Sequence, residues 1–461
     1  MNLRTLGILA VAALSAAACD EALDPTPQQT IPFEEALDTP EEVRVAVNAM
    51  YDALQNCDGG YCRNLIIFPD LYAGNLAFTG TFTSDREVAR RNVTAANTAL
   101  PGMWGTAYSG INRANNVLAA LPALQAQFNA DEYAQLQGEA HFVRALNYLN
   151  LVNFFGGVPL VTEPITEVPD DVRQARNSQA EIFAFIEQEL AMARAQLPEL
   201  GSDAAGRASY EAATALLARV HTYQKEWAPA YALADEIIES NTFSLEPQYV
   251  NVFEKEQTDE AIFEIPFTVT DPGSLAFWFF PGSRGGRYGI APSANLVDSF
   301  EEGDARFDVA YQPEADGDDY GNKYTDIAST ADDIPVLRLA EMYLIRAEAA
   351  ARLGDFEQAL ADVNVLRQRA GLVVDYDETS ADLDEDGTLE SEEVLQIVLD
   401  ERRHELFYEG HWFFDMKRFA DAVPSAAARL TTLGIVGNKL IFPIPQREID
   451  ANPALIQNPG Y

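Results

Sequence analysis

Two distant segments of the chain repeat one pattern of small and aromatic residues. RASYEAATALLARVHTYQKEWAPAYALADEII carries Ala218, and LRLAEMYLIRAEAAARLGDFEQALADVNVLR carries Ala347 at the matching position. In each segment a tight turn follows, and an aromatic residue (Trp227 or Phe356) comes directly after it. Small residues let two helices cross closely, and an aromatic ring fills the gap beside the crossing. The pattern therefore predicts antiparallel helix pairs.

This is the tetratricopeptide pattern, in a degenerate form that does not predict a long regular solenoid. Other parts of the chain also show helical periodicity. Pro40 followed by Glu41 and Glu42 predicts a helix start, and Gly156-Gly157 predicts a helix end. Further helices are predicted near 179–197, 207–225, 228–240, 335–353, 355–370, 391–409 and 411–421. The fold class is mainly α.

The region 241–330 differs from the rest of the chain. It is rich in glycine, proline and aromatic residues, with short β-like runs such as EAIFEIPFTV. Long irregular segments in a helical protein usually carry function. We expect one domain over 31–461, in which a helical half (31–240) and a second half (331–461) flank this loop-rich ligand region.

The charge balance excludes one broad class of partner. The 461 residues include 72 acidic and 31 basic ones, which gives a net charge of −41. Such a chain repels nucleic-acid phosphates unless it carries a local basic patch. The basic runs are no longer than Arg402-Arg403 or Lys417-Arg418. We therefore expect no nucleic-acid partner.

Residues 1–18 have the form of a bacterial export signal. Arg4 provides a positive charge, an apolar stretch follows, and small residues precede Cys19. The stretch is too short for a lasting membrane-spanning helix. The small residues before Cys19 resemble a lipoprotein cleavage site, although Ala16 stands where leucine is commonest. We expect a signal peptide over 1–18, a lipid on Cys19 and a tether over 19–30; the alternative is a buried N-terminal helix.

Two cysteines remain, Cys57 and Cys62, in the run NCDGGYC. Export places them in an oxidising compartment, where an even count favours a disulfide. A metal site would need two more ligands nearby, and no histidine is close in the sequence. The disulfide is the favoured interpretation.

Three further stretches make the chain similar to a known family. They are GEAHFVRALNYLNLVNFFGGVPLVTE (138–163), IVLDERRHELFYEGHWFFDMKRF (397–419) and LIFPIPQREIDANPALIQNPGY (440–461). Together with the second helix-pair segment and the lipoprotein start, they resemble the RagB/SusD family over nearly the whole mature chain.

These stretches also have a structural interpretation without the family. Arg402, Arg403 and Glu405 alternate with apolar residues, which indicates an ion-pair network and not catalysis. The four prolines of the C-terminal stretch predict an extended strap without regular structure.

The resemblance implies a SusD-like helical fold, an outer-membrane location and a partner. The partner is a SusC-like TonB-dependent β-barrel transporter, and the ligand is an oligosaccharide or sometimes a peptide. Acidic residues directly after Cys19 are similar to a surface-export tag, so we expect a lipid-anchored protein exposed at the cell surface. The alternative is a tetratricopeptide scaffold lipoprotein for outer-membrane assembly.

Sugar-binding sites combine aromatic rings, which stack on sugar rings, with side chains that hydrogen-bond to hydroxyl groups. Two segments have this mix: the run after the two cysteines, and SLAFWFFPGSRGGRYG, which could equally contain a buried strand. The candidate ligand-binding residues are Asp70, Tyr72, Asn75, Phe78, Trp278, Phe280, Arg284, Arg287 and Tyr288.

Residues 382–393, DLDEDGTLESEE, match the loop of a calcium-binding EF-hand. The ligands would be oxygens of Asp382, Asp384, Asp386, Thr388 and Glu393, with Gly387 at the sharp turn. A helix is predicted after the loop but not before it. The alternative is an acidic surface loop without an ion. We expect a structural Ca²⁺.

The motifs of the large enzyme classes are missing from the sequence. It contains no G-x-S-x-G, no H-E-x-x-H, no P-loop and no dinucleotide fingerprint. In so acidic a chain, carboxylate pairs arise by chance and cannot indicate a glycosidase. We predict a binding protein and not an enzyme, with glycan hydrolysis as the weakest alternative.

Overall fold

The structure is a computed structural model, and we describe its residues 37–165, 173–200, 206–255, 257–373 and 375–461. Long helices dominate the chain, which confirms the mainly α fold class. Within the described ranges, no helix combines the length and the apolar character needed to cross a bilayer.

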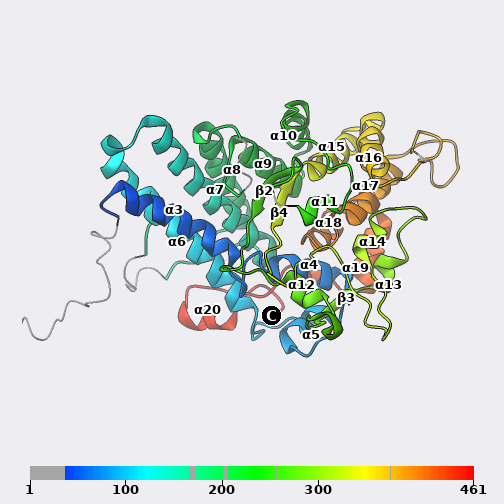
Figure 1. The fold of residues 1–461 in the computed structure, drawn as a ribbon, viewed down its shortest axis with the longest axis horizontal. Helices are drawn as coiled ribbons and strands as arrows, with labels where there is room; N and C mark the ends of the chain where they lie inside the picture. Colours follow the sequence, from blue (N-terminus) through cyan, green and yellow to red (C-terminus); the bar gives the residue numbers. More distant parts are fainter. Residues whose placement is uncertain (1–36, 166–172, 201–205, 256, 374) are drawn as a thin grey trace, which may run out of the picture.

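Eight helices form a row in which each packs against the next or against its second neighbour. Figure 1 shows most of them side by side along the upper part of the molecule. In chain order they are α6 (Leu100–Leu124), α7 (Ala130–Phe155), α8 (Gln179–Gln196), α9 (Tyr210–Gln224), α10 (Trp227–Glu239), α15 (Leu339–Leu353), α16 (Phe356–Arg369) and α17 (Ser391–Leu406).

The two predicted helix pairs are α9–α10 and α15–α16, and they are neighbours in space because α10 packs against α15. The small residues Ala218 and Ala347 are completely buried, as close crossings require. Trp227 and Phe356 pack against the core at the start of the second helix of each pair. Residues 240–338 form a long insertion between α10 and α15 and contribute no helix to the row.

Local signals set the predicted helix ends. Thr39 and Glu42 form a reciprocal capping box at the start of α3 (Pro40–Gln55). Gly156 follows α7 with a positive φ of 77°, a conformation that costs glycine little. The predicted helix near 335–353 is shorter than expected, because its first residues form strand β4 (Ile334–Arg338). All five residues of this strand are buried, and a short, fully buried run does not distinguish a strand from a helix.

The remaining elements are short and lie mostly on the other side of the row (Figure 1). Strands β1 (Leu76–Phe78) and β3 (Ile290–Pro292) pair antiparallel, with Ala77 opposite Ala291. Strand β2 (Ala261–Ile265) pairs antiparallel with β4. The short helices are α4 (Asn64–Ala73), α5 (Thr83–Ala89), α11 (Asn251–Glu254), α12 (Leu275–Phe279), α13 (Ala294–Val297), α14 (Phe307–Ala310), α18 (Trp412–Phe419), α19 (Pro424–Thr432) and α20 (Gln446–Ala451).

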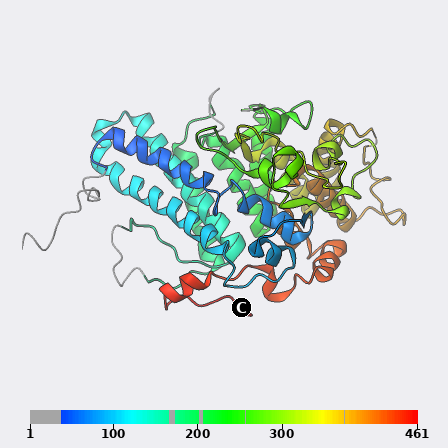
Figure 2. The same cartoon turned by 60° about the horizontal axis from the view of Figure 1, so that its bottom comes forward.

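The C-terminal segment crosses the molecule as a strap, seen in red in Figure 2. The backbone N–H of Phe442 donates to the carbonyl of Phe154 at 2.7 Å, and the Asn458 side chain donates to the carbonyl of Phe155 at 2.9 Å. The prediction of a strap without regular structure was wrong in its middle, where α20 forms. None of the four prolines lies within Gln446–Ala451, so a helical turn meets no obstacle there.

Glu405 is the centre of a buried ion-pair network, as the alternating charges of α17 predicted. Its carboxylate contacts Arg306 at 3.2 Å, Arg338 at 2.5 Å and also Arg369. These three guanidinium groups lower the pKa of Glu405 against the opposing effect of burial. On the same helix, Arg402 pairs with Asp415 at 2.9 Å. The network joins α17 to the strand and loops beside it.

Candidate functional site

The pairing of β1 with β3 brings two irregular segments together that are far apart in the sequence. The backbone N–H groups of Thr79 and Gly80 both donate to the carbonyl of Gly289, at 3.2 and 3.1 Å. The Thr79 hydroxyl donates to the carbonyl of Tyr288 at 2.6 Å. The loop after β1 therefore lies along the loop before β3, and both contribute to one surface.

We call the group Arg63, Phe82, Phe277, Trp278 and Arg287 the aromatic cluster. The ring of Trp278 lies 5.6 Å from that of Phe82 and 5.7 Å from that of Phe277, measured between centroids. The guanidinium of Arg287 lies 4.5 Å from the ring centre of Phe82, and that of Arg63 lies 3.9 Å from the ring centre of Trp278. Phe82 is 43% exposed and Phe277 is 36% exposed. The cluster thus presents two open rings with arginines beside them.

Backbone bonds and one glycine hold the cluster in place. The N–H of Arg287 donates to the carbonyl of Phe277 at 2.7 Å, and the N–H of Gly289 donates to the carbonyl of Trp278 at 2.9 Å. A Cβ atom on Gly289 would lie 2.8 Å from the Trp278 ring, so only glycine permits this close packing. Arg63 is fixed by an ion pair with the buried Asp85.

An open cavity of about 690 Å³ lies against the aromatic cluster. Its lining includes the three rings, Arg63, Asn64 and Cys57. Aromatic faces with nearby guanidinium and amide donors suit a sugar, whose ring has apolar C–H faces and polar hydroxyl groups. The size falls within the range of small-ligand sites.

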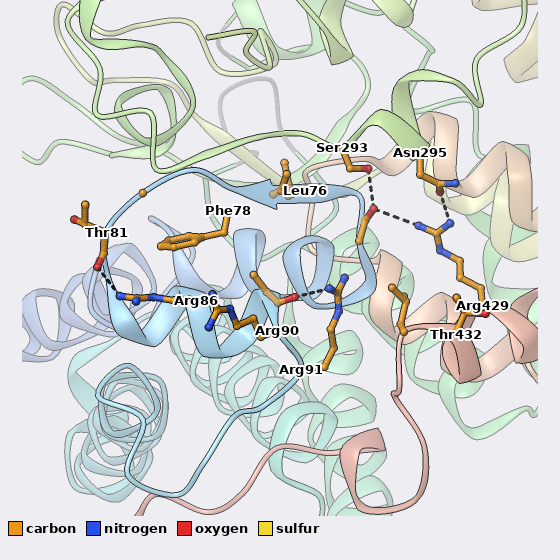
Figure 3. A pocket seen from close by; sticks show the side chains of 15 residues that line it. Leu76, Phe78, Thr81, Arg86, Arg90, Arg91, Ser293, Asn295, Arg429 and Thr432 are labelled. Carbon is orange, nitrogen blue, oxygen red and sulfur yellow. Dashed lines mark hydrogen bonds between the residues drawn. The ribbon is translucent and has the colours of Figure 1, made fainter. Parts of the chain in front are cut away.

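A second, larger cavity of about 990 Å³ adjoins the first. Its basic lining residues are Arg86, Arg90, Arg91 and Arg429, and we call it the arginine pocket. Figure 3 shows Arg86, Arg90 and Arg91 near Phe78, with Arg429 on the other side of the view beside Asn295.

The structure separates the nine candidate ligand-binding residues. Trp278 and Arg287 belong to the aromatic cluster, and Phe78 lines the arginine pocket. Arg284 lies elsewhere, in an ion pair with Glu314 at 2.7 Å. The hydroxyl of the half-buried Tyr288 donates to the carbonyl of Asp319 at 3.1 Å.

Four of the nine candidate side chains are buried in the core, where a ligand at the surface does not reach them. Asp70 accepts hydrogen bonds from the Asn75 side chain at 3.0 Å and from the backbone of Tyr408 and Gly410. The Tyr72 hydroxyl donates to the carbonyl of Lys439 at 2.9 Å, and the Phe280 ring packs edge-on against Tyr320. The buried candidates are Asp70, Tyr72, Asn75 and Phe280.

Sequence reasoning missed Arg63, Phe82 and Phe277 in the aromatic cluster and all four arginines of the pocket. The run TFTSDREVARR contained a usable signal, since an aromatic residue stands just ahead of three closely spaced arginines. Arg429 gave no such signal, because it joins the others only through the fold.

The cysteines behave as expected, and the structure joins Cys57 and Cys62 in a disulfide. Cys57 itself lines the cavity beside the aromatic cluster. The proposed lipid-bearing Cys19 lies outside the described residues.

The loop 382–393 brings carboxylates together as a calcium loop requires. Ligand oxygens of Asp382, Asp384 and Glu393 lie within 4.8 Å of one another. Asp382 accepts a hydrogen bond from the N–H of Gly387 at 2.7 Å, and Gly387 has a positive φ of 88°. Helix α17 follows the loop, and no helix directly precedes it in the described residues 375–381. Asp386 and Thr388 are not part of this carboxylate group; the Thr388 N–H donates to Asp386 at 2.8 Å.

Two family patterns match most of the sequence. One is described as "SusD family" and matches residues 315–461; the other is described as "Starch-binding associating with outer membrane" and matches residues 23–222. The second description names starch binding, which agrees with the prediction of a binding protein.

Individual relatives cover almost the whole chain. SusD-like protein P38 of Formosa agariphila is 27% identical over 96% of both chains. A SusD superfamily protein of Bacteroides vulgatus has the same fold with a TM-score of 0.81, at 21% identity over 92% of this chain and 100% of that one. A laminarin-binding SusD-like protein has a TM-score of 0.78, at 24% identity over the same two shares. The family patterns, the full-length relative and the shared fold agree, and the chain belongs to the RagB/SusD family.

Proposed function

We propose that this protein binds an oligosaccharide at the aromatic cluster on the outer-membrane surface and delivers it to a TonB-dependent transporter. The observation that carries the proposal is the pair of exposed rings, Phe82 and Phe277, held open beside a cavity of about 690 Å³. Exposed aromatic side chains on a rigid frame are typical of sugar recognition. The family description and the laminarin-binding relative support a glycan as the ligand.

The lipid anchor and the transporter belong to the proposal as well. The export signal before Cys19 supports anchoring by acyl chains, which hold a protein stably only when more than one is present. A protein that binds a nutrient at the outer membrane needs a route for that nutrient across the membrane. The family resemblance implies that this route is a TonB-dependent β-barrel.

Glycan binding is tested by calorimetric titration of the mature protein with laminarin and starch oligosaccharides. Trp278→Ala removes the ring between Phe82 and Phe277, and we expect binding to weaken about 30-fold, since a tryptophan that a bound ligand covers is worth about 2 kcal/mol. Trp227→Ala is the matched control, because Trp227 on α10 also lies beside an arginine, Arg352, at 4.9 Å. Equal losses in the two variants would contradict the proposal.

The transporter partnership is tested by purification from native membranes in mild detergent, followed by mass spectrometry. We expect a stoichiometric TonB-dependent barrel. Recovery of outer-membrane assembly proteins instead would favour the alternative of a tetratricopeptide scaffold lipoprotein.

We also propose that the loop 382–393 binds a structural Ca²⁺. The three converging carboxylates of Asp382, Asp384 and Glu393 support it, as does the turn at Gly387. Exposed extracellular calcium loops bind at ~10⁻⁴–10⁻³ M. The ion would fix this acidic loop against the start of α17.

A further inference from the structure

The arginine pocket and the aromatic cluster share one wall, the segment 80–86. Gly80, Thr81 and Arg86 line the arginine pocket, whereas Phe82, Ser84 and Asp85 line the cavity of the aromatic cluster. A ligand longer than one sugar ring can therefore contact both surfaces. Figure 3 shows how the pocket continues from Thr81 and Arg86 past Arg90 and Arg91 to Arg429.

The pocket contains no acidic side chain. None of its 15 lining residues is an aspartate or glutamate, although the chain carries 72 of them. Among the described residues, none of the four pocket arginines is in an ion pair, whereas the nearby Arg63 is paired with Asp85. In a chain of net charge −41, four unpaired arginines in one cavity form a local site of positive potential.

Neutral carbonyl groups hold two of these arginines in place. Arg91 Nε donates to the carbonyl of Tyr72 at 2.9 Å, and Arg429 Nη2 donates to the carbonyl of Gly74 at 3.2 Å. These carbonyls belong to the C-terminal end of α4, where the helix dipole is negative. The dipole orients the guanidinium groups but leaves their net charge uncompensated.

A fifth arginine lies directly behind the pocket and adds to its charge. Arg403 and Arg429 both donate to the same side-chain oxygen of Asn295, Arg403 at 2.7 Å. Burial, followed by the neighbouring charge of Arg429, lowers the pKa of Arg403 to about 9. The carboxylates of Asp400 and Asp70 oppose this decrease in the pKa, and Asp70 is linked to Arg403 by way of the Asn75 side chain.

The pocket also has unused hydrogen-bond donors. The Nε–H groups of Arg86 and Arg429 are buried and have no acceptor among the described residues. The exposed side chain of Arg90 has no side-chain hydrogen bond there either. These donors are available to a ligand that enters the pocket.

We propose that the arginine pocket binds the anionic substituents, carboxylate or sulfate, of a glycan whose neutral rings lie on the aromatic cluster. Guanidinium groups match both oxyanions, because their planar donors form paired, charge-assisted hydrogen bonds. The pocket would also overcome the repulsion between an acidic protein and an anionic sugar chain. This inference rests on the proposed glycan-binding function and names the class of glycan.

The test is calorimetric titration of the mature protein with three oligosaccharides of equal length. One carries only carboxylates (a uronate chain), one carries only sulfates (a sulfated galactan), and one is neutral (laminarin). The variants are Arg90→Gln, which leaves every described hydrogen bond intact, and Arg86→Gln/Arg90→Gln. Arg44→Gln on α3 is the matched control, since it removes the same charge outside the pocket.

We expect an anionic oligosaccharide to bind more tightly than the neutral one, and more weakly as NaCl is raised. Arg90→Gln should weaken the anionic ligand about tenfold, the double variant further, and neither should change binding of the neutral ligand. Whichever of the uronate and sulfated chains shows this loss identifies the anion.

Preference for the neutral chain, or anionic binding that survives both variants, would overturn the inference and leave the proposed function intact. Absence of binding to all three chains would overturn both.

Discussion

The molecule contains two groups of arginines that differ in their partners. Around Glu405, the guanidinium groups of Arg306 and Arg338 are fully buried. Each also contacts a second carboxylate at 2.8 Å, Asp304 for Arg306 and Glu409 for Arg338. In the arginine pocket, Arg91 and Arg429 meet only carbonyl and amide oxygens within the described part of the chain. The positive charges of the first group are neutralised by carboxylates, whereas those of the second group meet only the dipoles of uncharged groups.

This difference shows how arginine acts in structure and in recognition. A paired, buried arginine joins elements and has no donor to offer a ligand. An unpaired arginine at a cavity costs little while water or salt can reach it, and it keeps its donors available. Behind the pocket, the Asn75 side chain donates to Asp70 and accepts from Arg403 at 2.8 Å.

The variant Glu405→Gln gives the strongest test of the difference between the paired and the unpaired arginines. Removing one partner of a buried ion network leaves uncompensated charge, so we expect the free energy of unfolding to fall by about 3–5 kcal/mol. Arg90→Gln should change it by less than about 0.5 kcal/mol, as for most exposed residues. Urea denaturation followed by circular dichroism measures both values, and similar losses in the two variants would remove the distinction.

Asp70, buried behind the arginine pocket and linked to Arg403 through Asn75, predicts a pH dependence. Burial raises its pKa from 3.8 to about 7, so the folded state holds the proton more tightly than the unfolded chain does. Its contribution to stability is therefore fully present below about pH 4 and is lost as the pH rises through about 7, at up to about 1.4 kcal/mol per pH unit. The unfolding free energy of the wild type minus that of Asp70→Asn should therefore decrease with this slope between about pH 4 and about pH 7. A difference that does not change with pH would show that Asp70 does not titrate there.

The loop 382–393 offers the same comparison for negative charge, because the carboxylates of Asp382, Asp384 and Glu393 converge and have no ion pair among the described residues. We expect 10 mM Ca²⁺ to stabilise the protein by about 1.4–2.7 kcal/mol if the affinity is ~10⁻⁴–10⁻³ M. Asp384→Ala should abolish this effect, whereas Glu385→Ala, at a position without a ligand role, should preserve it. Thermal unfolding with Ca²⁺ and with Mg²⁺ measures it; equal stabilisation by both ions would indicate screening and not a site.

Much of the fold could be predicted because its signals are local. The alanines at 218 and 347, the capping box at Thr39 and the glycine after Phe155 each determine the backbone around them. The strand over Ile334–Arg338 could not be distinguished from a helix, because it is buried on both faces and pairs with a strand distant in sequence. The helix α20 was missed because proline spacing, and not proline number, decides where a helical turn fits.

The site was harder to predict than the fold. Asp70 and Tyr72 have the chemistry of sugar binders, but α4 directs them into the core, where other polar groups satisfy them. Residue type alone cannot reveal that direction in a short helix that is buried nearly all round. Arg429 reaches the pocket only because α19 packs near the end of α4, which no local pattern records.

The central claim is that the glycan lies on the aromatic cluster. The most direct test is a crystal structure of the protein with the oligosaccharide that binds most tightly in the titrations. We expect a sugar ring in contact with Phe82 or Phe277, with any anionic substituent directed toward Arg86 and Arg90. A sugar bound at another surface, with the aromatic cluster free, would contradict it.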